Sequence, residues 1–226
     1  MTNLNKKSGK KIIFFIVTVI LVLLVAAAVF LALRYINNND NFHDSEDLVL
    51  QGRSDLDTDA PLQSDIENYT VAAEKPRYLS IPTLGINNAR VVELGLSGST
   101  NQLDDPTNIN DAGWYTGSAL PGRAADDKMA GLYDGHNTGY NAMGIFYRLN
   151  NLQIGDEIII ERGDGEKFTY AVAENQMPLL EDVDMRKMLQ PVKTGTEGLN
   201  IITCGGDWDK DRNTYTHRVT IRASLK

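Results

Sequence analysis

Cysteine occurs only once in this chain of 226 residues, and histidine only three times. A single cysteine cannot form an intramolecular disulfide, which excludes a disulfide-stabilised scaffold. One cysteine and three histidines also leave too few soft ligands for a structural zinc site. Lysine and arginine are fewer than the acidic residues, 22 against 30, and the formal net charge of −8 is a poor electrostatic match for nucleic acid.

Charge is absent from residues 12–33, where Thr18 is the only polar residue. As a helix rising ~1.5 Å per residue, this run is about 33 Å long, enough to cross a hydrocarbon core of ~30 Å. A cleaved signal peptide would instead have an apolar region of about 7–15 residues. Four lysines precede the run and Arg34 follows it, an asymmetry that predicts a cytoplasmic N-terminus. We therefore expect a basic tail at 1–11 and an uncleaved signal anchor at 12–33.

The remainder of the chain is strongly acidic. Beyond residue 34 there are 17 basic and 30 acidic residues, a formal charge of −13. This balance suits an exported domain and argues against docking on an anionic lipid surface. Residues 34–76 are polar and show no sustained period, which predicts a linker with at most a short helix at 64–74.

Residues 77–226 consist mainly of short apolar runs separated by Gly, Asp and Asn turns. Gly163-Asp164-Gly165 lies between two such runs and is typical of a hairpin turn. Helical spacing is limited to 142–149 and 182–189. The pattern predicts a mostly β domain built as a closed or nearly closed barrel. The predicted strands are 78–81, 89–94, 128–133, 156–162, 167–173, 199–204 and 215–223.

Cys204 is the first candidate for chemistry. It ends an apolar run and precedes Gly205-Gly206, so we expect it at a strand end, facing a glycine-rich loop. The simplest alternative is a small buried packing residue, the usual fate of a free cysteine. An idle exposed thiol would, however, be an oxidation liability outside the cell.

His136 is the candidate acid–base residue, because it follows a strand-like run among turn formers. A neutral imidazole can take a proton from a thiol, and an imidazolium can protonate a leaving amine. Alone, His136 would be read as a surface histidine. We expect His43 to be inert in the linker and His217 to be a partly exposed strand residue.

Arg218 is the candidate oxyanion donor. Val219, Ile221 and Ala223 alternate with arginines in the last run, so the arginines point away from the apolar face. A guanidinium there can stabilise an oxyanion or bind a substrate carbonyl. Arg222 is expected on a solvated face, and Arg212 in the preceding loop is a competing candidate.

The order His136, Thr203-Cys204 and Arg218 resembles the sortases, cysteine transpeptidases of the Gram-positive cell surface. The resemblance runs through residues 77–226 and is nearest to class F. Its supporting segments are Gly113-Trp114-Tyr115, Pro121-Gly122, Gly135-His136, Gly144-Ile145-Phe146, Leu152-x-x-Gly155-Asp156 and Thr203-Cys204-Gly205-Gly206. Two departures are Asn200 and Ile201, which replace the Thr and Leu of the family motif Thr-Leu-x-Thr-Cys. Class F often has its arginine where this chain has Thr216, whereas Arg218 fits the class A register.

The resemblance implies an eight-stranded β-barrel, a signal anchor in the plasma membrane and a catalytic domain outside the cell. It implies that Cys204 attacks a carbonyl in a Leu-Pro-x-Thr-Gly-like sorting signal and forms an acyl-enzyme. His136 would then protonate the leaving amine, and Arg218 would steady the oxyanion with support from Thr203 and Gly205. The partners implied are surface proteins that carry the signal and an amine acceptor, either a cell-wall precursor or a protein lysine. Residues 174–198 would form the loop that shapes the signal's pocket.

A non-catalytic, membrane-tethered binding barrel is the alternative from a different class, with Cys204 merely packed. No cofactor is implied. Asp207-x-Asp209-x-Asp211 begins like a calcium loop, but Arg212 and Arg218 stand where an EF-hand has Gly and Glu, so calcium is unsupported.

Overall fold

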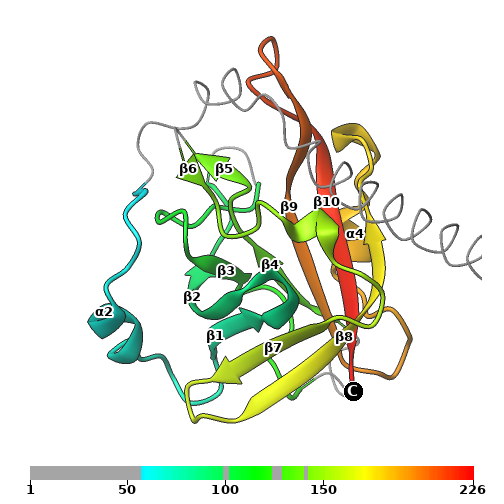
Figure 1. The fold of residues 1–226 in the computed structure, drawn as a ribbon. Coiled ribbons are helices and arrows are strands. Elements are labelled where there is room, and N and C mark those ends of the chain that lie inside the picture. The colour runs from blue at the N-terminus through cyan, green and yellow to red at the C-terminus, as the bar shows by residue number, and fades with distance from the viewer. Residues whose placement is uncertain (1–56, 99–101, 124–128, 140–141) are drawn as a thin grey trace, which may run out of the picture. The chain divides into compact units, whose positions relative to one another are not determined.

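The structure, a computed structural model, describes residues 57–98, 102–123, 129–139 and 142–226. Within these residues eight strands close into a barrel in the order β1-β2-β3-β4-β9-β10-β8-β7, with β7 pairing back to β1 (Figure 1). The pairs β2/β3 and β4/β9 are parallel and the others antiparallel. The barrel strands are β1 (Pro76–Ile81), β2 (Ile86–Leu94), β3 (Ala112–Tyr115), β4 (Gly131–Asp134), β7 (Glu157–Arg162), β8 (Lys167–Gln176), β9 (Gly198–Asp209) and β10 (Thr214–Leu225).

The remaining helices and strands are short and are not part of the barrel. The strands β5 (Thr138–Gly139) and β6 (Ala142–Met143) pair with each other in a separate two-stranded sheet. The helices are α2 (Gln63–Glu67), α4 (Met185–Met188) and the 3-10 turns η2 (Pro82–Leu84), η3 (Leu149–Asn151) and η4 (Leu180–Asp182). The mostly β prediction and the closed eight-stranded barrel are therefore confirmed.

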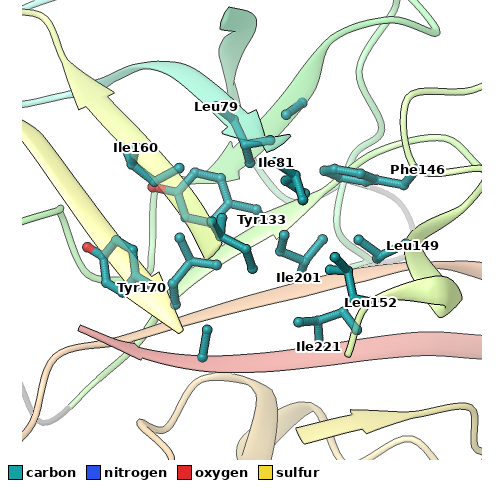
Figure 2. Packing of buried hydrophobic residues seen from close by; sticks show 14 of the residues in the cluster. Leu79, Ile81, Tyr133, Phe146, Leu149, Leu152, Ile160, Tyr170, Ile201 and Ile221 are labelled. Carbon is teal, nitrogen blue, oxygen red and sulfur yellow. The ribbon is translucent and has the colours of Figure 1, made fainter. Parts of the chain in front are cut away.

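The barrel interior is filled by alternate residues of its strands. On β9 and β10, Leu199, Ile201, Val219 and Ile221 face inward, and Ile201 pairs with Ile221 across the two strands. Full burial of one such side chain contributes ~1.5–3 kcal/mol. Figure 2 shows aromatic and aliphatic side chains from several strands meeting here, with Tyr133 of β4 among them. The residues between them lie on the outer face of the two strands, as the alternation predicted for β10.

Three details of the secondary structure were predicted wrongly. No helix forms at 142–149, where β6 is followed by turns that lead to η3. β3 was not predicted as a strand, because its four residues carry no alternation of their own and it is held by β2 and β4. β9 continues through Asp209, so Cys204 lies within a strand and not at its end.

The structure describes part of the predicted linker and none of the predicted anchor. Residues 57–75 pack against the barrel, with Tyr69 donating a hydrogen bond to the carbonyl of Val91 at 2.7 Å. The short helix expected at 64–74 is α2, which ends earlier, at Glu67. The predicted anchor at 12–33 and His43 lie outside the described residues. In the part of the chain that the structure describes, no helix is long and apolar enough to span a membrane.

Candidate active site

Cys204 and Arg218 face each other across β9 and β10. The two residues are direct partners in the antiparallel register, and both belong to the outward-facing set of their strands. Directly opposed residues have Cβ atoms about 4.5–5.5 Å apart and share one face of the sheet. The structure therefore brings together two of the three predicted site residues by strand register alone.

The Arg218 guanidinium is held by the backbone of its own strand. Its Nη1 donates to the carbonyls of His217 at 2.9 Å and Tyr215 at 3.2 Å, and its Nη2 donates to the Thr214 hydroxyl at 3.2 Å. These contacts fix the planar group while leaving it half-buried. Arg212 is an exposed residue of the loop between β9 and β10, where it pairs with Asp209 and Glu181. Arg218 is thus the arginine that accompanies the cysteine.

His136 lies in the loop after β4, and its neighbours on both sides are bonded to β9. The Thr203 hydroxyl donates to the carbonyl of Gly135 at 2.7 Å, and the Asn137 amide donates to the carbonyl of Cys204 at 2.8 Å. The loop that carries the imidazole is thereby tied to the strand at Cys204 itself. The residues on either side of His136 are thus bonded to the strand that carries Cys204. That His136 acts together with Cys204 and Arg218 stays a prediction.

Backbone contacts explain why a helix is excluded after His136. The amide of Phe146 donates to the carbonyl of His136 at 2.9 Å, and that of Gly144 donates to the carbonyl of Asn137 at 2.7 Å. A Cβ at Gly144 would lie 2.2 Å from the His136 carbonyl oxygen. The segment from Gly144 to Phe146 therefore lies against the backbone of His136, and only glycine fits at the closest approach.

The remaining two predicted residues support the site from within. Thr203 is almost fully buried and commits its hydroxyl to Gly135, so it positions the histidine loop. Gly205 follows Cys204 in β9, where an added Cβ would lie 2.9 Å from a methyl group of Val219 and 3.4 Å from the Met177 sulfur. Glycine thus lets the segment after β8 approach the strand next to the cysteine.

Two acidic residues near the thiol were not singled out from the sequence. Asp134 ends β4 and pairs with Ile202, which lies two residues before Cys204 on the same face. Burial raises the pKa of the Asp134 carboxyl to about 8; Asp105 adds to the rise, and Arg218 opposes it. The period of two along β4 could have placed Asp134 on this face, but nothing in the sequence placed Asp105 near it.

The thiol itself is protonated at rest at neutral pH. Burial, with contributions from the carboxylates of Asp134 and Asp105, raises the pKa of Cys204 to about 11, although the Arg218 guanidinium acts to lower it. The active nucleophile is the thiolate. With this pKa the thiolate is a minor form at neutral pH until the thiol proton passes to a base.

We predict that alkylation of Cys204 by iodoacetamide accelerates about tenfold per pH unit from pH 7 to 10, because only the thiolate reacts. The chain has one cysteine, so the whole signal reports this site, and Cys204→Ala gives the blank. At pH 9 Cys204 should be alkylated several-fold faster in Asp134→Asn, because this substitution removes a negative charge that raises the thiol pKa. A rate that levels off near pH 8.5, the pKa of an ordinary thiol, would contradict the effect of burial.

Residues 177–190 run along one side of the site. The amide of Arg218 donates to the carbonyl of Pro178 at 3.1 Å, and Leu179 forms a bridge with His217. Met177, Leu179 and Met185 are exposed to solvent by 40–48%, so an apolar surface borders the outer face of β10. That residues 174–198 shape the pocket for a sorting signal stays a prediction.

Arg222 is not on a solvated face, and that prediction is wrong. It is 6% exposed, pairs with Glu174 at 2.7 Å, and donates to the carbonyls of Gln190 and Pro191. Asn200, the first departure from the family motif, lies beside it and donates to the carbonyls of Met188 and Gln190. Both residues hold the segment that contains α4 over the barrel, which the strand alternation alone could not reveal.

The described residues contain no cluster of three or more His, Cys, Asp and Glu side chains that could hold a metal ion. Asp209, in the segment that begins like a calcium loop, is instead paired with Arg212. His217 is a half-exposed strand residue, as predicted, and its Nδ1 lies 2.8 Å from the Thr216 hydroxyl.

The sequence matches the sortase domain over residues 79–226. Since the match covers more than half of the chain, the protein belongs to the sortase family and is a cysteine transpeptidase. Its class within the family stays a prediction from sequence.

Solved structures of sortases are similar to this chain. Streptococcus agalactiae sortase C1, in complex with MTSET, is 18% identical, with a TM-score of 0.49 and coverage of 70% of this chain and 72% of that one. Sortase C1 from Streptococcus suis is 20% identical, with a TM-score of 0.49 and coverage of 73% and 79%. Sortase A from Corynebacterium diphtheriae is 25% identical, with a TM-score of 0.48 and coverage of 69% and 63%. No curated protein matches the chain.

Proposed function

We propose that this protein is a membrane-anchored sortase that joins proteins carrying a Leu-Pro-x-Thr-Gly-like signal to an amine acceptor through an acyl-enzyme on Cys204. The observation that carries the proposal is the register of β9 and β10, which pairs Cys204 with Arg218. The bonds from Thr203 to Gly135 and from Asn137 to Cys204 support a place for His136 in the same site.

In the first half of the reaction, the Cys204 thiolate attacks the carbonyl carbon of the scissile peptide bond. The carbon becomes tetrahedral and its oxygen gains a negative charge, which the nearby Arg218 guanidinium stabilises. The C–N bond then breaks, and His136, as the imidazolium, gives its proton to the leaving amine. A thioester on Cys204 remains.

In the second half, an acceptor amine attacks the thioester carbonyl. His136, now neutral, takes a proton from the attacking nitrogen, and the C–S bond breaks to return the thiolate. One peptide bond is broken and one amide bond is formed, so the reaction needs no cofactor. Arg218 serves both tetrahedral intermediates from one position.

Formation of the thiolate has its own requirement. The thiol pKa of about 11 means that the resting site holds mostly thiol at neutral pH. A substrate that displaces water from the site strengthens the attraction between Arg218 and the thiolate, because the local dielectric falls. The guanidinium therefore has two tasks, one before the attack and one during it.

The setting outside the cell is part of the same proposal. The uncharged run at 12–33 and the four preceding lysines support a single-pass anchor in the plasma membrane, with the barrel on the outer side. The acceptor would then be a cell-wall precursor or a lysine of another surface protein.

The test uses the full chain in detergent micelles, with Cys204→Ala as the matched control. Each protein is incubated with a Leu-Pro-x-Thr-Gly peptide library and an amine acceptor, and the products are read by mass spectrometry. We expect cleavage at one Thr–Gly bond, the threonine joined to the amine, and no product with Cys204→Ala. Absence of both cleavage and a covalent adduct on Cys204 would contradict the proposal and favour a tethered binding barrel.

A further inference from the structure

The imidazole of His136 has a partner that is not a side chain. Its Nε2 lies 2.7 Å from the carbonyl oxygen of Pro106, which is in the segment between β2 and β3. A carbonyl oxygen only accepts hydrogen bonds, so Nε2 carries a hydrogen in this contact. The neutral ring is therefore held as the Nε2–H form, and Nδ1 is the nitrogen left to exchange a proton.

The segment that supplies this carbonyl is braced by the chain that precedes the barrel. The amide of Asp57 donates to the carbonyl of Thr107 at 3.0 Å, and that of Ile109 donates to the carbonyl of Asp57 at 2.9 Å. The side chain of Asn108 donates to the Asp57 carboxylate at 2.8 Å and to the Asp59 carbonyl at 2.9 Å. Pro106 and Asn108 are both buried, so the segment has little freedom to move away from the imidazole.

The same brace reaches His136 from the other side. The amide of Ile145 donates to the carbonyl of Ile109 at 3.0 Å, and the next amide, that of Phe146, donates to the carbonyl of His136 at 2.9 Å. Pro106 and the backbone of His136 are thus tied to one frame. A fixed distance between the proline carbonyl and the ring nitrogen follows from this arrangement.

We propose that the Pro106 carbonyl is the positioning group for His136, and that the contact between Asp57 and Asn108 keeps it in place. This inference rests on the proposed acid–base role of His136. The Nε2–H bond is made by the imidazole and by the imidazolium alike, so Nδ1 gains and loses the proton while the ring stays still. One orientation therefore serves both the departure of the first amine and the attack of the second.

This arrangement also gives the chain before the barrel a part in the chemistry. The bonds of residues 57–59 given above reach neither β9, which carries Cys204, nor β10, which carries Arg218, yet these residues hold the group that orients the histidine. Loosening them should change proton transfer and leave the thiol as it was. A merely structural role would instead lower stability and change every property of the site together.

The experiment compares Asn108→Ala with Asn87→Ala in the full chain. Asn108→Ala removes the donor to Asp57 and Asp59, whereas Asn87 is an exposed residue at the start of β2 whose side chain donates to the carbonyl of Gly85. Misplacing a catalytic group by about 1 Å costs up to ~10²-fold, so we expect kcat to fall about 10–100-fold in Asn108→Ala. The peptide KM and the rate of Cys204 alkylation should change less than about twofold, and Asn87→Ala should match the unchanged protein.

The ring itself gives a readout that does not depend on turnover. The ¹⁵N chemical shifts of the His136 imidazole distinguish the Nε2–H form from the Nδ1–H form. We expect a single Nε2–H form in the unchanged protein and a mixture in Asn108→Ala. If the sorting-signal peptides are not turned over at all, the proposed function fails, but the ring spectrum still tests the Pro106 contact.

A second pair of variants covers the case in which Asn108→Ala does not fold. Pro106→Ala keeps a restricted backbone and Pro106→Gly releases it, while both retain the carbonyl. The mixed spectrum and the fall in kcat should be larger with glycine than with alanine. An unchanged ring spectrum and kcat in Pro106→Gly would overturn the proposal, and so would a rise in kcat, which would mean that the segment shields His136.

Discussion

Replacing Arg218 by lysine is expected to lower kcat for transpeptidation by about 10²–10³-fold, the usual cost of losing one oxyanion donor. The guanidinium is oriented by three simultaneous bonds, to Tyr215, His217 and Thr214. An ammonium group is a compact point charge and cannot reproduce the planar fork. The kinetics of peptide cleavage, measured as kcat and KM separately, check this expectation.

Alanine at the same position separates geometry from charge. The Arg218 guanidinium lowers the pKa of Cys204, so Arg218→Ala should raise that pKa and slow iodoacetamide alkylation at a given pH. Lysine keeps the positive charge and should retain most of the alkylation rate while losing kcat. The matched control is Arg212→Ala, whose exposed side chain pairs with Asp209 and Glu181 and should change kcat less than about twofold. A larger loss of kcat in Arg212→Ala than in Arg218→Ala would mean that Arg212, and not Arg218, has this role.

The strand alternation was sufficient to predict the half of the site that lies on β10. Period two along this run placed Ile221 on the apolar face and Arg218 on the opposite face, and the structure has this arrangement. The pairing of Cys204 with Arg218 could not be predicted, because register depends on the turn between the strands and on the neighbouring β4 and β8.

Contacts between segments far apart in the sequence account for the errors. The alternation along β10 alone predicts that Arg222 faces solvent. The residue is buried against Glu174 because residues 174–191 fold over β10. The helical spacing at 142–149 is likewise overridden by the return of this segment over His136. The role of Pro106 could not be predicted from the sequence, because the contact uses its backbone carbonyl, and Asp57 and Asn108 hold that carbonyl in place.

Gly144→Ala is expected to be the most damaging substitution at a residue that touches no substrate. The added Cβ would lie 2.2 Å from the carbonyl oxygen of His136 and 2.5 Å from its carbonyl carbon. Both atoms are backbone, and the oxygen is already engaged by the amide of Phe146, so a rotamer change cannot relieve the contact. The loop must shift as a unit, which moves the imidazole.

We expect Gly144→Ala to lower kcat by at least about 10²-fold, since small displacements of an acid–base group have effects of this size. Gly98→Ala is the matched control, because a Cβ there has nothing within 4 Å and the backbone is not in the left-handed region. The thermal midpoint and Cys204 alkylation distinguish displacement from unfolding: alkylation at pH 9 should persist while kcat falls. If Gly144→Ala were as active as Gly98→Ala, the position of His136 would not depend on this close approach, and its orientation would have to come from Pro106 and the bonds to β9 alone.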